Sequence, residues 1–241
     1  MARPPTRSCG PLDQRPLETR PDVLVFTTPP LTAQVALSGP LVAELFVGTD
    51  VLDTDVVVKL VDVYPKGSKV GKYAGTSTLV ADGITRLRWR DFPATNTPQL
   101  LSRDPTVVVP VTVSLWNTTY IFAPGHSIRV HVTSSNWPRF FPNPNNGLPV
   151  AVQGTGPNVT AHTTVQLGGA YPSRIILPMV DAATQLPAFP VEATIKQSLE
   201  PLRGAWREAL GRMGEANVDE PFEEWAARRL GAAAAHARLR R

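Results

Sequence analysis

The sequence is poor in cysteine and in long hydrophobic runs, and each shortage excludes a class of protein. The single cysteine, Cys9, rules out an internal disulfide and any metal site built from cysteines. No apolar run reaches the roughly 18–20 residues of a membrane helix, and the N-terminus lacks the apolar core of a signal peptide. We therefore expect a cytoplasmic protein without a membrane-spanning segment.

Charge of one sign is also scarce. Residues 1–191 hold 15 basic and 12 acidic side chains, and residues 192–241 hold 9 and 8. Neither part has the one-sided basic excess of a nucleic-acid-binding protein, so we expect no nucleic-acid partner. The four histidines are dispersed and no close cluster of His, Asp and Glu is present, so we expect no metal and no other cofactor.

Proline and glycine, in contrast, are abundant, with 25 and 17 residues. Such frequent turn formers exclude a helical bundle and suit a chain of short strands. Twenty-three of the prolines lie before residue 191, and only Pro201 and Pro221 follow. This uneven distribution predicts a domain boundary near residue 190.

Before that boundary, the hydrophobic pattern is that of β-strands. Apolar and polar side chains alternate in residues 128–133, as in a half-buried antiparallel strand with His131 on the polar face. Residues 56–64 are apolar on both faces apart from Lys59 and Asp62, which predicts a central strand in a two-layer stack. Further strands are predicted at residues 22–26, 33–38, 41–47, 84–90, 107–115, 162–167 and 174–177. Together they predict an all-β domain over residues 22–190, a jelly-roll β-sandwich of the galactose-binding-like kind.

After residue 191 the pattern becomes helical. Apolar residues recur every three or four positions, which predicts two helices at residues 198–213 and 219–238. These helices form a short C-terminal extension, residues 191–241, which is too small to build a core of its own.

The chain shows no pattern of an active site. A serine hydrolase would present its nucleophile on a Gly-x-Ser-x-Gly turn between a strand and a helix, and none occurs. Ser68 and Ser77 are predicted to lie in a polar hairpin instead. Asp50, Asp53 and Asp55 lack the glycine and glutamate spacing of a Ca²⁺ loop and are interpreted as turn caps.

The histidines are assigned structural or surface positions. His126, His131 and His162 have no visible nucleophile to serve as a base. Pro124, Gly125 and His126 are predicted to form a structural turn, in which the ring of His126 hydrogen-bonds the turn. We therefore assign no catalytic residue and no metal ligand.

The loop after the strand at 128–133 is the most informative segment, because it combines aromatic, cationic and amide side chains. Aromatic and arginine side chains in one loop are typical of a protein interface or a sugar-binding ledge. Alternatively, Trp137 and Phe140 cap the end of the sandwich while Asn136 satisfies loop backbone groups. The interface candidates are Asn136, Trp137, Arg139, Phe140, Phe141 and Asn143.

This loop also carries a resemblance to a known family. The stretch Pro124-Gly125-His126-Ser127-Ile128-Arg129-Val130, then Ser134-Ser135-Asn136-Trp137-Pro138-Arg139 and Asn143-Pro144-Asn145, is followed by Pro172-Ser173-Arg174. Upstream come Asp13-Gln14-Arg15, then Lys59-Leu60-Val61-Asp62-Val63-Tyr64-Pro65, then Asp82-Gly83. Over about residues 10–180 the chain resembles the C-terminal domain of the X-Pro dipeptidyl-peptidase, cocaine-esterase and α-amino-acid ester hydrolase family.

The resemblance implies a jelly roll that follows an α/β-hydrolase domain, whose own residues supply the nucleophile, the acid and the histidine of a serine hydrolase. It implies that this chain is the accessory domain, which docks on the hydrolase domain and shapes its substrate entrance. Residues 1–21 would be the leader arriving from that domain, docking through residues 10–21 and the loop at 134–147. The resemblance leaves open whether the chain is itself an enzyme. It also leaves open whether the chain is a truncated gene product, the product of a split gene or an isolated fragment.

Two other functions remain as alternatives. A free-standing module would bind carbohydrate or protein, using Trp137, Phe140 and Phe141 as stacking surfaces. An adaptor would use the two C-terminal helices to reach another protein. A homo-oligomer is compatible with either.

Overall fold

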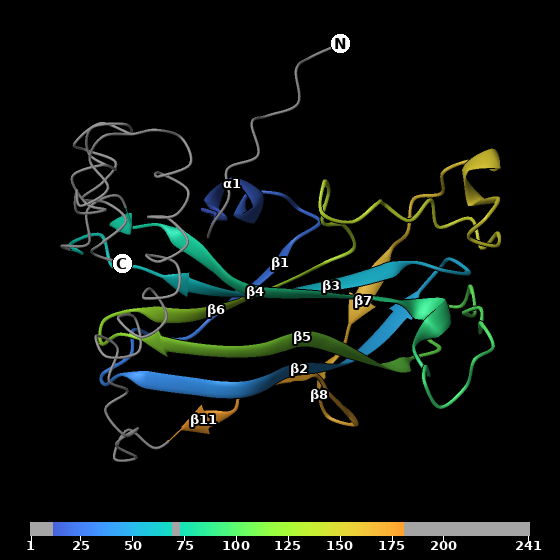
Figure 1. Cartoon of the computed structure of the whole chain (residues 1–241). Helices are drawn as coiled ribbons and strands as arrows, with labels where there is room; N and C mark the ends of the chain where they lie inside the picture. Colours follow the sequence, from blue (N-terminus) through green and yellow to red (C-terminus); the bar gives the residue numbers. More distant parts are fainter. Residues whose placement is uncertain (1–11, 69–72, 181–241) are drawn as a thin grey trace, which may run out of the picture. The chain divides into compact units, whose positions relative to one another are not determined.

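The computed structural model describes residues 12–68 and 73–180, which fold as an all-β sandwich (Figure 1). The chain divides into two compact units, Met1–Thr184 and Gln185–Arg241. Cys9 and the two helices predicted at 198–213 and 219–238 lie outside the described residues. The elements in chain order are α1 (Arg15–Glu18), β1 (Leu24–Thr27), β2 (Val35–Thr49), β3 (Asp55–Val63), β4 (Ser77–Arg86), the 3₁₀ turn η2 (Leu87–Trp89), β5 (Val109–Phe122), β6 (Ser127–Thr133), the 3₁₀ turn η3 (Gln153–Thr155), β7 (Thr163–Val165), β8 (Leu167–Gly168), β9 (Tyr171–Pro172), β10 (Arg174–Ile176) and β11 (Met179–Val180).

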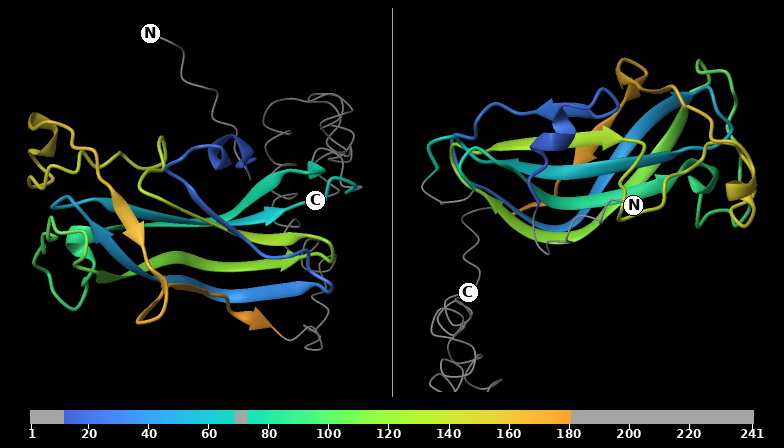
Figure 2. Two further views of the ribbon diagram at one scale, coloured as in Figure 1. Left: turned by 180° about the vertical axis from the view of Figure 1, so that it is seen from behind. Right: turned by 90° about the horizontal axis from the view of Figure 1, so that it is seen from above.

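Two antiparallel sheets form the layers of the sandwich. The first has the strand order β1–β6–β3–β4. In the second, β2 is central: β5 pairs along one side, and β7, β10 and β11 pair in succession along the other. Figure 2 shows the two sheets stacked on one another. β8 and β9 form a separate two-stranded hairpin.

The inner faces of both sheets meet in one hydrophobic core. Alternate side chains of β2, β3 and β5 supply most of it, and side chains of β6, of η2 and of Leu101 in the following loop complete it. The central strand predicted at 56–64 is confirmed, since every residue of β3 except Val63 is buried and β3 lies between β6 and β4. The core members are Leu37, Leu41, Ala43, Leu45, Val47, Val56, Val58, Leu60, Leu87, Leu101, Val111, Val113, Leu115, Phe122, Ile128 and Val132.

The two layers lie close together where β4 meets β5. A Cβ atom added at Gly83 would lie 2.0 Å from the backbone oxygen of Ser114, so only glycine fits there. Beside it, the Thr85 hydroxyl donates a hydrogen bond to the Thr112 carbonyl at 2.8 Å. A backbone atom cannot move aside as a flexible side chain can, so Gly83 sets the spacing of the layers along this edge.

Several predicted strand boundaries are wrong. The strands predicted at 33–38 and 41–47 are one strand, β2, which continues through a register shift between Pro40 and Val42. The strand predicted at 84–90 ends at Arg86, because Leu87–Trp89 forms a 3₁₀ turn, and it begins at Ser77. Ser77 is therefore a buried strand residue rather than part of a polar hairpin.

Candidate docking surface

The loop after β6 is fastened to β4 by one buried carboxylate. Asp82 accepts a hydrogen bond from the Asn136 amide at 2.7 Å and pairs with the Arg139 guanidinium at 2.7 Å. The backbone N–H groups of Arg139 and Phe140 both donate to the carbonyl of Asn136, at 2.9 and 3.1 Å. We call residues 136–141 the aromatic turn. Its backbone is fixed on the outer face of the first sheet, because Asp82 pairs in register with Lys59, which lies outside the core.

The aromatic turn presents two rings to its surroundings. Trp137 is 63% exposed and Phe141 is 80% exposed, and their ring centroids lie 5.7 Å apart in a tilted pair. Trp137 therefore does not cap the end of the sandwich. Phe140 is half-buried, with the Arg139 guanidinium 5.5 Å from its ring centroid. Large exposed aromatic side chains held next to one another are typical of a surface that a partner covers.

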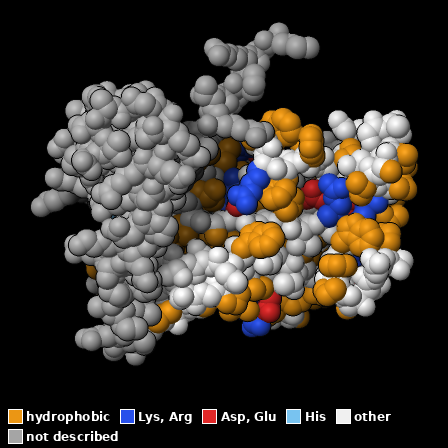
Figure 3. All heavy atoms as spheres, in the orientation of Figure 1, with side chains coloured by type: hydrophobic (Ala, Val, Ile, Leu, Met, Phe, Trp, Pro, Cys, Tyr) orange, Lys and Arg blue, Asp and Glu red, His pale blue; other side chains and the backbone are white. Residues whose placement is uncertain are grey.

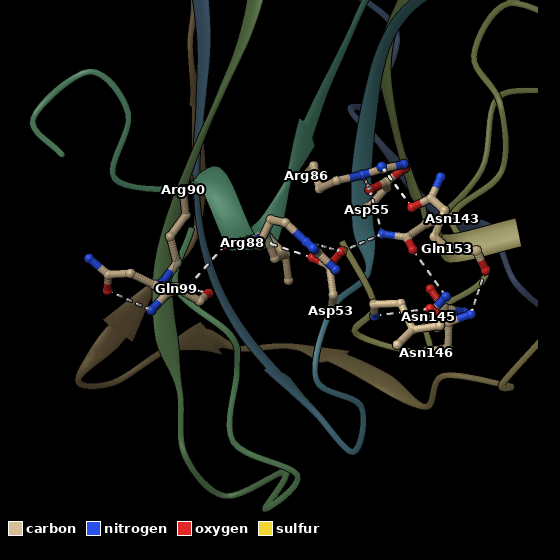
Figure 4. A network of polar contacts seen from close by, with 12 residues as sticks. Asp53, Asp55, Arg86, Arg88, Arg90, Gln99, Asn143, Asn145, Asn146 and Gln153 are labelled. Carbon is tan, nitrogen blue, oxygen red and sulfur yellow. Dashed lines mark hydrogen bonds and ion pairs between the residues drawn. The ribbon is translucent and has the colours of Figure 1, made fainter. Parts of the chain in front are cut away.

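The second half of the loop is tied to the end of the sheet at which β3 begins and β4 ends (Figure 4). Asn143 donates to Asp53 at 3.1 Å and to Asp55 at 2.9 Å. Asp53 also pairs with Arg88 at 2.7 Å and Asp55 with Arg86 at 2.8 Å, and both carboxylates are buried. Asn143 is thus a structural anchor of the loop, whereas Trp137 and Phe141 are free to contact another molecule.

The acidic residues singled out in the sequence have cationic or polar partners. Asp53 and Asp55 bind the two arginines just described. Asp50 accepts from the backbone N–H of His162 at 2.8 Å and contacts its ring at 2.7 Å, and these hydrogen bonds lower the pKa of Asp50. Within residues 12–68 and 73–180, no group of three or more His, Cys, Asp or Glu side chains is placed to hold a metal ion.

The leader segment, defined here as residues 12–20, packs on the outer face of the first sheet. The backbone N–H of Gln14 donates to the Ser77 carbonyl at 2.7 Å, and its side chain accepts from the buried ammonium of Lys59 at 3.1 Å. Glu18 of α1 accepts from Arg129 at 2.6 Å. Sequence reasoning missed α1, although Pro16 near its start and Glu18 in its first turn are ordinary signals of a helix N-terminus.

The leader segment also buries His131, which the sequence pattern places on a polar face. His131 is fully buried, and its Nε2 atom lies 3.2 Å from Glu18. Burial lowers the pKa of His131 and also that of Lys59, because both charged forms lose hydration. On the face drawn in Figure 3, Lys and Arg side chains lie beside Asp and Glu side chains.

The turn at 124–126 lies at the other end of the sandwich from the network of Asp53 and Asp55. Gly125 has φ +83°, a conformation that favours glycine. The ring of His126 does not hydrogen-bond the turn as predicted; its Nδ1 lies 2.8 Å from Asp62 of β3. Tyr120 of β5 also donates to Asp62, at 2.9 Å, and burial beside this carboxylate raises the pKa of Tyr120. His126 thus ties the turn to β3 of the first sheet, and Tyr120 ties the same carboxylate to β5 of the second sheet.

Comparisons with known proteins decide the family. The sequence model of the X-Pro dipeptidyl-peptidase C-terminal non-catalytic domain matches residues 5–176, which include the leader segment, Asp82 and the aromatic turn. The chain belongs to this family. A cocaine esterase from Rhodococcus sp. (strain MB1 Bresler) is 36% identical over 171 residues, covering 71% of this chain and 28% of the esterase.

Solved structures give the same result. An aminopeptidase from the marine sediment archaeon Thaumarchaeota archaeon matches with 32% identity and a TM-score of 0.63, over 70% of this chain and 27% of that one. An α-amino acid ester hydrolase matches with 34% identity and a TM-score of 0.63, over the same shares. The chain therefore spans little more than a quarter of the length of these relatives.

No helix among the described residues is long and apolar enough to cross a membrane.

Proposed function

We propose that this chain is an accessory domain that docks on an α/β-hydrolase catalytic domain and shapes its substrate entrance. The observation that carries the proposal is the exposed pair Trp137 and Phe141, which Asp82 holds in a fixed turn. The family is described as the non-catalytic C-terminal domain of X-Pro dipeptidyl-peptidases, which supports a partner that performs the chemistry.

The leader segment, on the same outer face of the first sheet, supports the same proposal. Gln14 and Glu18 attach it to Lys59 and Arg129, so the chain reaches the sandwich at a fixed place. A polypeptide arriving from a hydrolase domain would thus meet the outer face of the first sheet, where the aromatic turn also lies. Two elements far apart in sequence would then contact one partner.

A binding experiment tests the docking. The full chain is co-expressed with the catalytic part of the cocaine esterase relative, freed of its own C-terminal domain, and the complex is measured by affinity. Replacing Trp137 and Phe141 together by alanine is expected to weaken binding by about tenfold or more, because exposed aromatic pairs are frequent binding hot spots. Trp116→Ala is the matched control, since Trp116 is 71% exposed on β5 of the other sheet. Absence of a wild-type complex, or equal loss with Trp116→Ala, would contradict the proposal.

Activity measurements test the role at the substrate entrance. In the complex, Trp137→Ala is expected to change KM for a bulky ester more than for a small ester, and to leave kcat for the small ester unchanged. A covalent serine-hydrolase probe is expected to label the catalytic partner and not this chain. Specific labelling of the isolated chain would show that it carries an active site of its own.

The exposed Trp137 also favours a second candidate, a free-standing carbohydrate-binding module. Trp137 and Phe141 are accessible for stacking on a sugar, but Phe140 is half-buried beside Arg139 and offers little surface. A glycan array with the wild type and Trp137→Ala separates the two functions. Sugar binding that disappears in the variant, together with no binding to the hydrolase, would favour the module.

A further inference from the structure

A small cavity with both polar and apolar lining residues lies between the leader segment and the outer face of the first sheet. Its volume is about 20 Å³, and its floor is formed by Lys59 of β3 and by His131 and Thr133 of β6. Leu17 and Arg20 close it on the side of the leader, and Ser135 closes it on the side of the loop that leads into the aromatic turn. The cavity thus touches the leader segment, the first sheet and Ser135, the residue directly before the aromatic turn.

The groups around this cavity have hydrogen-bonding capacity that the protein does not satisfy. Both ring nitrogens of His131 and the hydroxyl of Thr133 are buried without a hydrogen-bond partner. His131 Nε2 lies within 3.2 Å of Glu18 Oε1, but neither atom makes a hydrogen bond there. Lys59 is 5% exposed and, among the described residues, donates only to Gln14, although an ammonium has three donors.

Buried polar groups of this kind nearly always have a partner. A cavity needs at least about 10–15 Å³ to hold one water molecule, and the water needs two to four polar neighbours. We propose that this cavity is the binding site of one internal water molecule, which accepts from Lys59 and bridges it to His131 and Thr133. The water bridges β3 and β6 beneath the leader segment, and the inference does not depend on the proposed function.

The chemistry of the lining favours water over a small anion such as chloride. Burial lowers the pKa of His131 although Glu18 acts in the opposite direction, and the charges of Lys59 and Arg129 lower it further. The neutral imidazole that burial favours has one donor and one acceptor nitrogen. Glu18 Oε1, beside that ring, is an acceptor as well. An anion accepts hydrogen bonds and cannot donate to these atoms, whereas water does both. The positive charges nearby are also largely paired, Arg20 with Asp22, Arg129 with Glu18 and Arg139 with Asp82.

A crystal structure of the full chain at a resolution that shows ordered water tests the site directly. One density peak is expected within hydrogen-bonding distance of Lys59 Nζ, Thr133 Oγ1 and a ring nitrogen of His131. Crystals soaked in bromide are expected to show no anomalous signal at that peak. An empty cavity would overturn the proposal, and so would a bromide signal, which would identify an anion site instead.

Solution measurements provide a second test that needs no crystal. In the wild type, NMR cross-relaxation is expected between a long-lived water and the side-chain protons of His131 and Thr133. Thr133→Val, which keeps the shape and removes the hydroxyl, is expected to lose this signal and to speed hydrogen exchange of the Gln14 N–H. Thr133→Ser keeps the hydroxyl and is the matched control. The proposal fails if the wild type shows no such water, or if the valine and serine variants behave alike.

Discussion

At the scale of single residues, Asp82 makes the contacts that hold the aromatic turn on the first sheet. Its buried carboxylate binds the amide of Asn136 and the guanidinium of Arg139, two groups that the sequence pattern already placed in one loop. The sequence did not indicate that Asp82, more than fifty residues earlier, is their partner. Strand β4 brings it there through its register with β3, where Asp82 lies opposite Lys59.

Asp82→Asn is expected to lower the free energy of unfolding by about 1–3 kcal/mol, since it weakens hydrogen bonds between a buried carboxylate and two donors. Urea denaturation followed by circular dichroism measures the change. Asp104→Asn serves as the control, because Asp104 is exposed and its carboxylate accepts hydrogen bonds only from Thr106, its near neighbour in sequence. Equal losses in the two variants would show that Asp82 does not fix the turn.

His131 gives the chain a dependence on pH with a definite sign. Burial lowers its pKa in the folded protein below the usual 6.5, although Glu18 acts in the opposite direction. At pH values well above 6.5 the ring is neutral in both the folded and the unfolded protein, so its titration does not reduce the free energy of unfolding. As the pH falls below 6.5, the unfolded chain binds a proton that the folded protein does not, so stability decreases.

Denaturation between about pH 7 and pH 5, above the usual titration range of carboxylates, measures this effect. His131→Gln is expected to lose less stability over that range than the wild type loses, because the titrating group is gone. His162→Gln is the matched control, the same substitution at a histidine side chain that is 80% exposed. A wild-type slope that persists in His131→Gln would assign the pH dependence to another group.

At the scale of elements, the predictions succeeded where the pattern is local and failed where distant contacts decide. β3 and β6 follow directly from apolar runs and alternation. β2 could not be recognised as one strand, because the sequence Gly39-Pro40 is typical of a turn. In the structure Gly39 has φ +135°, yet both residues remain paired with β5 and the strand continues. β9 and β11 have two residues each, and only their partners define them as strands.

The close approach of β4 and β5 yields a sharp prediction. Gly83→Ala is expected to destabilise the protein by about 3 kcal/mol, at the upper end for overpacked sites, because its Cβ would meet backbone atoms of Ser114. Thermal denaturation and the yield of soluble protein measure the loss. Gly67→Ala is the matched control, since a Cβ there meets nothing within 4 Å, and a change within about 1 kcal/mol is expected. A small loss at Gly83 would mean that the layers can separate at this edge.

At the scale of the whole molecule, the order of short motifs was enough to indicate the family and the all-β sandwich, since each motif lies at a fixed place in the fold. The geometry of the candidate docking surface could not be predicted from the sequence. Trp137 and Phe141 were singled out by residue type, but the turn that presents them is held by Asp82. The cavity under the leader segment is lined by Leu17 of α1, a helix that the sequence pattern did not reveal. Residues of the leader, β3, β4 and β6 meet there only after folding.

The arrangement of the core leads to a last prediction, on the boundary of the sandwich domain. Every residue of the core and its partly buried border lies between Leu31 and Leu177, and the compact unit that contains them ends at Thr184. We therefore expect a chain of residues 1–184 to fold by itself, with a thermal midpoint within about 3 °C of the full chain. The free energy of unfolding of this shorter chain should decrease with urea concentration as steeply as that of a cooperative domain.

A matched truncation after Thr133 removes β7, β10 and β11, which pair with β2. We expect this chain to show no cooperative transition, because the second sheet loses all pairing on one side of its central strand. Loss of cooperative unfolding in residues 1–184 would instead show that the sandwich needs residues 185–241, and the predicted boundary near residue 190 would then be wrong.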